Sequence, residues 1–270
     1  MKTHINSLAL AYTDHGIGLP VIFLHAFPLN RAMWEGEIQA LLTDQRYRLV
    51  ALDWRGFGDS EISPASTTPA ISTMDMLADD VAGLMDALGI QQAVLCGLSL
   101  GGYAAFAFAR AYPQRLLGLI LADTRPTADT PEARANRENV ARLAETQGPG
   151  AVADLQLPRL ISDYTRQQHP EVETRVRQLI EVATPQGIAA ASRGMAARAD
   201  SSALLAKIAC PTLVIVGAED ALIPPSNARD YADHIPGAQL IVIPHAGHLS
   251  NLEQPLAFIQ TMRQFLQTLS

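Results

Sequence analysis

The sequence predicts an α/β protein with a mainly parallel, doubly wound sheet and a helical cap inserted after the sixth strand. Short apolar segments alternate with longer segments of helical periodicity through most of the 270 residues. Such alternation is typical of strand–helix–strand units that place helices on both faces of a sheet. Between about residues 125 and 200 the alternation stops, and Ala, Arg, Gln and Glu dominate. The length suits one α/β domain that carries an insertion.

Six apolar segments are the predicted strands of the parallel sheet. Several are almost wholly apolar, as expected of strands that helices cover on both faces. Residues 5–13 add an antiparallel hairpin at one edge. The six segments are Val21–His25, Arg48–Leu52, Ala93–Gly97, Leu117–Ala122, Thr212–Gly217 and Gln239–Ile243.

The segments between these strands are predicted to be helices. Gly89 and Pro113 follow two of them and are typical of helix ends. The predicted helices are Arg31–Leu42, Met74–Leu88, Leu100–Ala111, Ser226–His234 and Pro255–Leu269.

The stretch of residues 125–200 is predicted to be a helical cap above the strand ends, because it is too long for a loop. It contains ten arginines and ten acidic residues, so the whole net charge of −7 falls on the rest of the chain. The predicted domains are therefore an α/β core of residues 1–124 and 201–270 and a cap of residues 125–200.

The composition argues against several partners. With 20 basic and 27 acidic side chains, the chain would repel a nucleic-acid backbone. No apolar run is long enough to span a bilayer, and residues 1–20 lack the charged start and apolar block of a signal peptide. Cys96 and Cys210 lie at the edges of apolar segments, which favours reduced thiols over a disulfide or a metal site. We expect a cytoplasmic protein with no nucleic-acid or membrane partner.

The strongest local signal is Cys96-Gly97-Leu98-Ser99-Leu100-Gly101-Gly102, a G-x-S-x-G pattern between a predicted strand and a predicted helix. In this pattern a tight turn holds the serine in a strained backbone conformation. Side chains two residues before or after it would collide, and Gly97 and Gly101 avoid this. The turn also places backbone N–H groups at a helix N-terminus, where they face developing negative charge. Ser99 is the predicted nucleophile, and the Leu100 amide a predicted oxyanion donor.

The predicted general base is His248. It follows the last predicted strand, where a loop at the carboxyl edge of the sheet presents it, and Gly247 gives that loop freedom to aim the side chain. His245 is the nearby competitor and is interpreted as a loop residue. The chain order of serine, acid and histidine agrees with a G-x-S-x-G hydrolase.

Two carboxylates compete for the role of orienting the histidine. Asp220 follows the predicted strand Thr212–Gly217, and Asp123 follows Leu117–Ala122 in the same way. A buried carboxylate at either place would fix the histidine tautomer and stabilise the imidazolium that forms. Asp220 is preferred because it and His248 end neighbouring strand units, and Asp123 stays open as the alternative. The adjacent Glu219 is expected to point elsewhere.

Four separated segments resemble the α/β-hydrolase superfamily, and the resemblance covers essentially the whole chain. They are the Ser99 turn, Leu24-His25-Ala26-Phe27-Pro28, residues 53–60, and Gly217–Asp220 with Ala246-Gly247-His248. The segment of residues 246–255 is similar to capped hydrolases related to 3-oxoadipate enol-lactonases and to cofactor-free haloperoxidase-like esterases. This resemblance implies the α/β-hydrolase fold.

The resemblance also implies a second oxyanion donor. In the family, a His-Gly-x-Pro segment supplies an N–H from its third residue, which here is Phe27. Ala26 stands where glycine is usual, and its methyl group would shift the Phe27 amide if the position needs unusual backbone angles. His25 is then a structural residue of this loop, and Asp53 and Arg55 are assigned no chemistry.

Together these residues predict a serine hydrolase that cleaves a carboxylic ester or lactone through an acyl-enzyme, with no metal or cofactor. Two alternatives stay open. The same triad would serve a C–C bond hydrolase or a perhydrolase, and a ligand receptor would keep the fold without the chemistry. The acyl pocket is expected to be apolar, and the cap offers six candidates for its lining, although core packing is the favoured interpretation of any single one. The six are Leu155, Leu157, Leu160, Ile161, Leu179 and Ile180. The substrate's polarity and the oligomeric state are left open.

Overall fold

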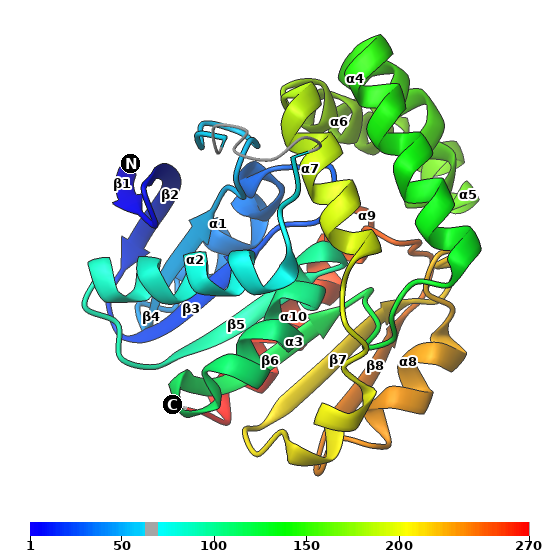
Figure 1. The fold of residues 1–270 in the computed structure, drawn as a ribbon. Coiled ribbons are helices and arrows are strands. Elements are labelled where there is room, and N and C mark those ends of the chain that lie inside the picture. The colour runs from blue at the N-terminus through cyan, green and yellow to red at the C-terminus, as the bar shows by residue number, and fades with distance from the viewer. Residues whose placement is uncertain (63–69, 270) are drawn as a thin grey trace.

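The computed structural model describes residues 1–62 and 70–269. In this part of the chain, eight strands form one sheet in the order β1-β2-β4-β3-β5-β6-β7-β8. Neighbouring strands from β4 to β8 are parallel, whereas β1 and β2 form an antiparallel hairpin at one edge. The predicted fold class is confirmed (Figure 1). The strands are β1 (Lys2–Ile5), β2 (Leu8–Gly16), β3 (Leu19–Leu24), β4 (Tyr47–Leu52), β5 (Ala93–Leu98), β6 (Leu116–Ala122), β7 (Thr212–Gly217) and β8 (Gln239–Ile243).

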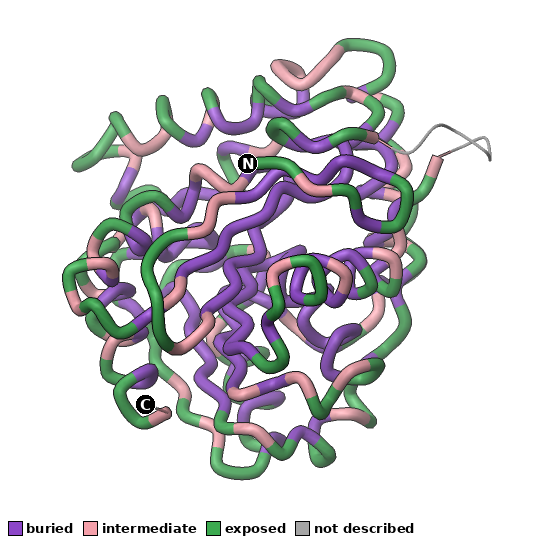
Figure 2. The backbone as a smooth tube through the Cα atoms, turned by 90° about the vertical axis from the view of Figure 1, so that its left-hand side faces the viewer, coloured by how far each residue is buried: buried purple, intermediate pink, exposed green. Residues whose placement is uncertain are grey.

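Helices cover both faces of the sheet, which explains why the central strands are continuously apolar. Every residue of β5 and β7 is buried, and Figure 2 shows buried backbone running through the middle of the molecule. One buried core lies between the sheet and α2 (Met74–Ala87), α3 (Leu100–Ala111) and α8 (Pro225–Ala232). A second core lies between the other face and α1 (Glu35–Leu42) and α10 (Pro255–Gln267).

The predicted helix Arg31–Leu42 is two elements in the structure. A 3₁₀ turn, η1 (Arg31–Trp34), comes first and α1 follows it directly. The side chain of Asn30 accepts a hydrogen bond from the Ala32 amide at 3.0 Å, which caps the tighter turn. The other core helices agree with the prediction to within two residues at each end.

Four helices follow β6 and pack together above the carboxyl ends of the strands (Figure 1). They are α4 (Pro131–Leu160), α5 (Asp163–Gln168), α6 (Pro170–Glu181) and α7 (Pro185–Ala196). Three of them begin with proline at the first helical position, where its fixed φ and missing N–H fit a helix start. We propose that residues 125–200, which contain all four helices, form the cap, and that residues 1–124 and 201–270 form the core.

Helix α4 is not continuous. Gly148 has φ 81° and ψ −179° inside it, a conformation that suits glycine and no other residue well, and Pro149 follows. The two halves therefore have different directions, and they pack against α7 and α6.

Helix α7 lies directly on the backbone of the core. Thr184 donates a hydrogen bond to the Gly56 carbonyl at 2.8 Å, and the Ser72 amide donates to the Ala190 carbonyl at 3.0 Å. A Cβ on Gly187 would lie 2.2 Å from the Gly56 carbonyl oxygen, so only glycine permits this approach.

In the described residues, none of the helices combines the length and apolar character that crossing a bilayer requires.

Candidate active site

The turn at Ser99 has the geometry that the G-x-S-x-G pattern predicts. Ser99 joins β5 to α3 with φ 54° and ψ −109°, a backbone conformation that residues with side chains rarely adopt. A Cβ on Gly97 would lie 2.4 Å from the carbonyl of Gly101, and one on Gly101 would lie 2.0 Å from the Leu24 carbonyl oxygen. The glycines are therefore required by the close packing of the turn against its own helix and against β3.

Ser99, His248 and Asp220 are linked in series by hydrogen bonds. Ser99 Oγ lies 2.9 Å from His248 Nε2, and His248 Nδ1 lies 2.8 Å from Asp220 Oδ2. The other carboxylate oxygen of Asp220 accepts from the amides of Leu222 and Ile223, at 2.8 and 2.9 Å. Because an ionised carboxylate only accepts, Nδ1 carries the ring proton and leaves Nε2 free to accept from the serine hydroxyl.

Burial and charge act in opposite directions on His248. Burial, the largest single influence, lowers the pKa of the ring, but the charge and hydrogen bond of Asp220, with the charges of Asp123 and Glu253, together outweigh it. The pKa of His248 is therefore raised from its ordinary value of 6.5. A more basic histidine accepts a hydroxyl proton more readily.

The competing carboxylate, Asp123, is buried one strand away and contacts other groups. Its Oδ1 accepts from the Gly217 amide at 2.8 Å, and its Oδ2 accepts from the Ser250 hydroxyl. Burial, and next the negative charge of Asp220, raise the pKa of Asp123 well above its usual range. Asp123 thus links the end of β7 to the start of α9 (Ser250–Glu253). His248 lies two residues before the start of α9.

His245 and Glu219 lie outside the hydrogen-bonded series. The His245 side chain is 59% exposed, and its Nδ1 is 3.8 Å from Glu219 Oε1. Its ring stacks on Tyr164 of α5, with 4.3 Å between the ring centroids. These contacts of His245 and Glu219 do not include Ser99. The structure therefore places His248, and not His245, beside the serine.

The predicted oxyanion donors come from two different segments of the chain. Leu100 is the first residue of α3 and Phe27 follows β3. Within the described part of the chain, no group accepts a hydrogen bond from either amide. Ala26, where the resembled family has glycine, is fully buried and does not have a positive φ. The position therefore needs no glycine, and the alanine methyl group is accommodated.

His25 has a structural role, as expected. Its Nε2 accepts from the Trp54 amide at 3.0 Å, and the Trp54 indole N–H donates to the His25 carbonyl at 2.9 Å. Burial, the largest influence, lowers the pKa of His25 to about 3, so the ring stays neutral and holds β3 to the loop after β4.

Asp53 and Arg55 also act within the scaffold. Asp53 accepts from the amides of Arg31 and Asp59, at 2.8 and 3.0 Å. Arg55 forms a buried ion pair with Asp80 of α2, with 2.6 Å between its Nη2 and Asp80 Oδ1. Both side chains therefore hold the segment after β4 in place.

A cavity of about 240 Å³ opens above Ser99 and His248. Phe27, Leu160, Leu222 and Ile223 contribute apolar surface to it. Helix α4 contributes polar side chains from both of its halves, namely Asn136, Arg137, Gln156 and Arg159.

The structure distinguishes the two interpretations of the six apolar cap residues, lining of the cavity and packing in the core. Of these described residues, Leu160 lines the cavity, Leu155 is exposed, and the other four pack in the core beneath the cap. The polar residues were missed, although their spacing was a usable signal. Residues 133, 136, 137 and 140, and residues 156, 159 and 160, each lie on one side of a helix.

The fold and this site define a class of protein: a doubly wound α/β enzyme scaffold with a serine turn at the carboxyl edge of its sheet. A family model described as the alpha/beta hydrolase fold matches residues 20–255. The chain therefore belongs to the α/β hydrolase fold family.

Known proteins similar to this chain include esterases and lactonases. A 3-oxoadipate enol-lactonase from Acinetobacter baylyi is 32% identical over 88% of this chain and 85% of its own length. The solved structure of a thermophilic esterase from Thermogutta terrifontis is 45% identical, with a TM-score of 0.94 over 100% of this chain and 98% of that one. The enol-lactonase from Burkholderia xenovorans is 30% identical, with a TM-score of 0.89 over 99% of this chain and 100% of that one.

Proposed function

We propose that this protein is a serine hydrolase that cleaves a carboxylic ester or a lactone through an acyl-enzyme intermediate. The observation that carries the proposal is the 2.9 Å contact between Ser99 Oγ and His248 Nε2 beneath the cavity. The esterase and enol-lactonase names among similar proteins support the same substrate class.

In the acylation step, Ser99 Oγ attacks the carbonyl carbon while His248 Nε2 takes the hydroxyl proton. The carbonyl oxygen becomes an oxyanion, which the amides of Phe27 and Leu100 stabilise by hydrogen bonding. The carbon–oxygen bond of the ester then breaks, and the imidazolium returns its proton to the leaving alkoxide. Asp220 keeps the ring oriented and stabilises its positive charge throughout.

Deacylation repeats these steps with water as the nucleophile. His248 removes a proton from the water, the hydroxyl attacks the acyl carbon, and the proton passes to Ser99 Oγ as the ester bond breaks. For a lactone, the alcohol released in the first step stays attached to the acyl group. The product is a hydroxy acid, or a keto acid when the lactone is an enol ester.

The test is hydrolysis of p-nitrophenyl butyrate by the wild type and by Ser99→Ala. We expect Ser99→Ala to lose at least about 10⁴-fold in kcat while its circular dichroism spectrum is unchanged. Ser226→Ala, which changes an exposed serine on α8, is the matched control and should retain activity. Substantial turnover by folded Ser99→Ala would overturn the proposed function.

A further inference from the structure

The catalytic cavity is positively charged although the chain as a whole is negative. Arg125, Arg137 and Arg159 line it, and among the described lining residues Asp129 is the one carboxylate. The net charge of the chain is −7, so this local excess is not a consequence of composition. A concave site of one charge attracts the opposite charge of a ligand.

Asp129 cannot neutralise this excess, because it is shared among three arginines. Its Oδ1 is 2.9 Å from Arg125 Nη2 and 2.8 Å from Arg198 Nη2, and its Oδ2 is 3.2 Å from Arg137 Nε. Burial would raise the pKa of Asp129, but the hydrogen bond from Arg198 and the neighbouring arginine charges hold it at about 2. The described cavity wall therefore carries three guanidinium groups and one carboxylate, which is itself shared with Arg198 outside the cavity.

Hydrogen-bond donors in the cavity wall are unused. Arg159 has no hydrogen bond or ion pair with any residue in the described ranges. The Nε of Arg125 is buried and has no partner either. Buried polar atoms without partners are uncommon in proteins, and a guanidinium binds a carboxylate through two parallel N–H bonds.

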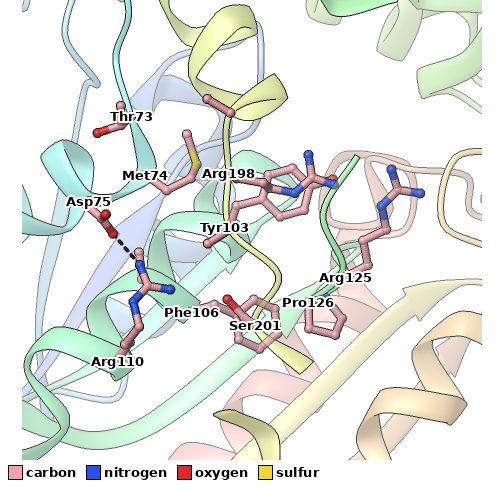
Figure 3. Close-up of a pocket in the computed structure, with 13 residues that line it drawn as sticks. Thr73, Met74, Asp75, Tyr103, Phe106, Arg110, Arg125, Pro126, Arg198 and Ser201 are labelled. Carbon is pink, nitrogen blue, oxygen red and sulfur yellow. Dashed lines mark hydrogen bonds and ion pairs between the residues drawn. The ribbon is translucent and has the colours of Figure 1, made fainter. Parts of the chain in front are cut away.

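Arg198, one of the arginines paired with Asp129, also packs against an aromatic ring. A second cavity of about 150 Å³ shares Tyr103 and Arg125 with the catalytic cavity. Its wall includes Arg198, whose guanidinium lies 4.2 Å from the centroid of the Tyr103 ring. Figure 3 shows Arg198 against this ring, with Arg125 to one side and Arg110 paired with Asp75 on the other. Fixed side chains lose little entropy when they bind a ligand.

We propose that the preferred substrate carries a carboxylate away from its scissile bond, and that Arg159, with Arg125 and Arg137, binds that carboxylate. The substrate class is an ester with a carboxylate on its acyl side, as in the half-ester of a dicarboxylic acid, or on its alcohol side, as in the ester of a hydroxy acid. This inference rests on the proposed function and specifies its substrate. A carboxylate is favoured because its two oxygens match the parallel N–H donors of a guanidinium.

The experiment compares charged esters with neutral esters of matched shape, followed by pH-stat titration. Monoethyl glutarate and ethyl 5-oxohexanoate differ in a carboxylate on the acyl side. 3-Butyryloxypropanoate and 4-butyryloxy-2-butanone differ in the same way on the alcohol side. We expect kcat/KM to favour the charged ester by about tenfold in one pair, as a charged hydrogen bond would provide. The pair that shows the preference identifies the side of the ester that meets the arginines.

The variant Arg159→Gln should reduce that preference by about fivefold or more, chiefly through KM. Arg159 is exposed and unpaired, so the variant is expected to fold. Arg142→Gln changes an exposed arginine of the same helix that forms an ion pair with Glu138. This control variant should show the wild-type preference in both pairs of esters. Raising the salt concentration should reduce the wild-type preference as well.

The outcomes distinguish this inference from the function on which it rests. Hydrolysis of the neutral esters without any preference for a charged one would overturn the carboxylate site alone. An unchanged preference in both Arg159→Gln and Arg125→Gln would do the same. If the wild type hydrolysed p-nitrophenyl butyrate but none of the four esters, the carboxylate site alone would be overturned, whereas failure on p-nitrophenyl butyrate as well would overturn the proposed function.

Discussion

His248 Nδ1 lies 2.8 Å from Asp220 Oδ2, and both side chains are almost fully buried. The histidine ring is therefore fixed at one nitrogen before any substrate arrives, and the other nitrogen meets Ser99. An enzyme gains rate from groups that need no rearrangement when charge develops.

Asp220→Asn should reduce kcat by about 10⁴-fold without unfolding the protein, because the amide favours the wrong histidine tautomer. The comparison is Asp123→Asn, which removes the rival carboxylate but no contact with His248. Its loss of kcat should be at least about tenfold smaller. Steady-state hydrolysis of p-nitrophenyl butyrate measures both. Equal losses would mean that the two carboxylates share the role.

The pH dependence of kcat/KM should follow the ionisation of His248. Activity requires the neutral ring, so it should rise with pH. The midpoint should lie above 6.5, because the charge of Asp220 raises the pKa of the histidine. In Asp220→Asn that charge is absent, and only the charges of Asp123 and Glu253 still oppose burial, so the pKa of His248 should fall below its wild-type value. Titration of the His248 ring signals by NMR measures the pKa of His248 in the Asp220→Asn variant. A wild-type midpoint below 6.5 would contradict the assignment.

Arg55→Met should destabilise the protein without changing its chemistry. The ion pair between Arg55 and Asp80 is buried, and removing one partner of such a pair costs about 3–5 kcal/mol. Arg142→Met, which breaks an exposed pair with Glu138, should cost only about 0.5 kcal/mol. Urea denaturation measures both free energies of unfolding. The kcat/KM of folded Arg55→Met should equal that of the wild type, and a large fall would show that the residue has a role in the site.

Ala26→Gly tests whether the departure from the family pattern matters. Because Ala26 does not have a positive φ and is buried, restoring glycine should not improve the oxyanion site. The variant should lose about 0.8 kcal/mol of stability with its methyl group and keep the wild-type kcat/KM. A clear rise in kcat would show that the methyl group displaces the Phe27 amide.

The Ser99 turn could be predicted from the sequence because its constraints are local. The steric need for Gly97 and Gly101 arises within the turn and its adjoining elements, and the pattern therefore records it directly. The strands could also be predicted, because a strand that is buried on both faces has a continuously apolar sequence. Predicted and observed bounds coincide for Thr212–Gly217 and Gln239–Ile243.

The choice between Asp123 and Asp220 could not be settled in this way. Both follow a strand of the same sheet, and both reach the same edge. The two differ in whether the carboxylate faces the His248 ring. This depends on the paths of the three loops that follow β6, β7 and β8, which carry Asp123, Asp220 and His248.

The residues that line the cavity could not be predicted from the sequence either, because they depend on how the cap packs on the core. Periodicity shows that a helix has two faces but not which one meets the core. The break at Gly148 turns the halves of α4 separately, and the polar faces that carry Arg137 and Arg159 line the cavity that contains Ser99.

The contact between α7 and the core also constrains how this protein can be recombined with others. A Cβ on Gly194 would lie 1.7 Å from the Ser72 carbonyl oxygen, just as Gly187 meets Gly56. A chimaera that took its cap from a relative would place foreign side chains against these two carbonyls. Because both contacts are to backbone carbonyls, a foreign cap would need glycine at the positions of Gly187 and Gly194, whatever side chain the core carries at residue 72.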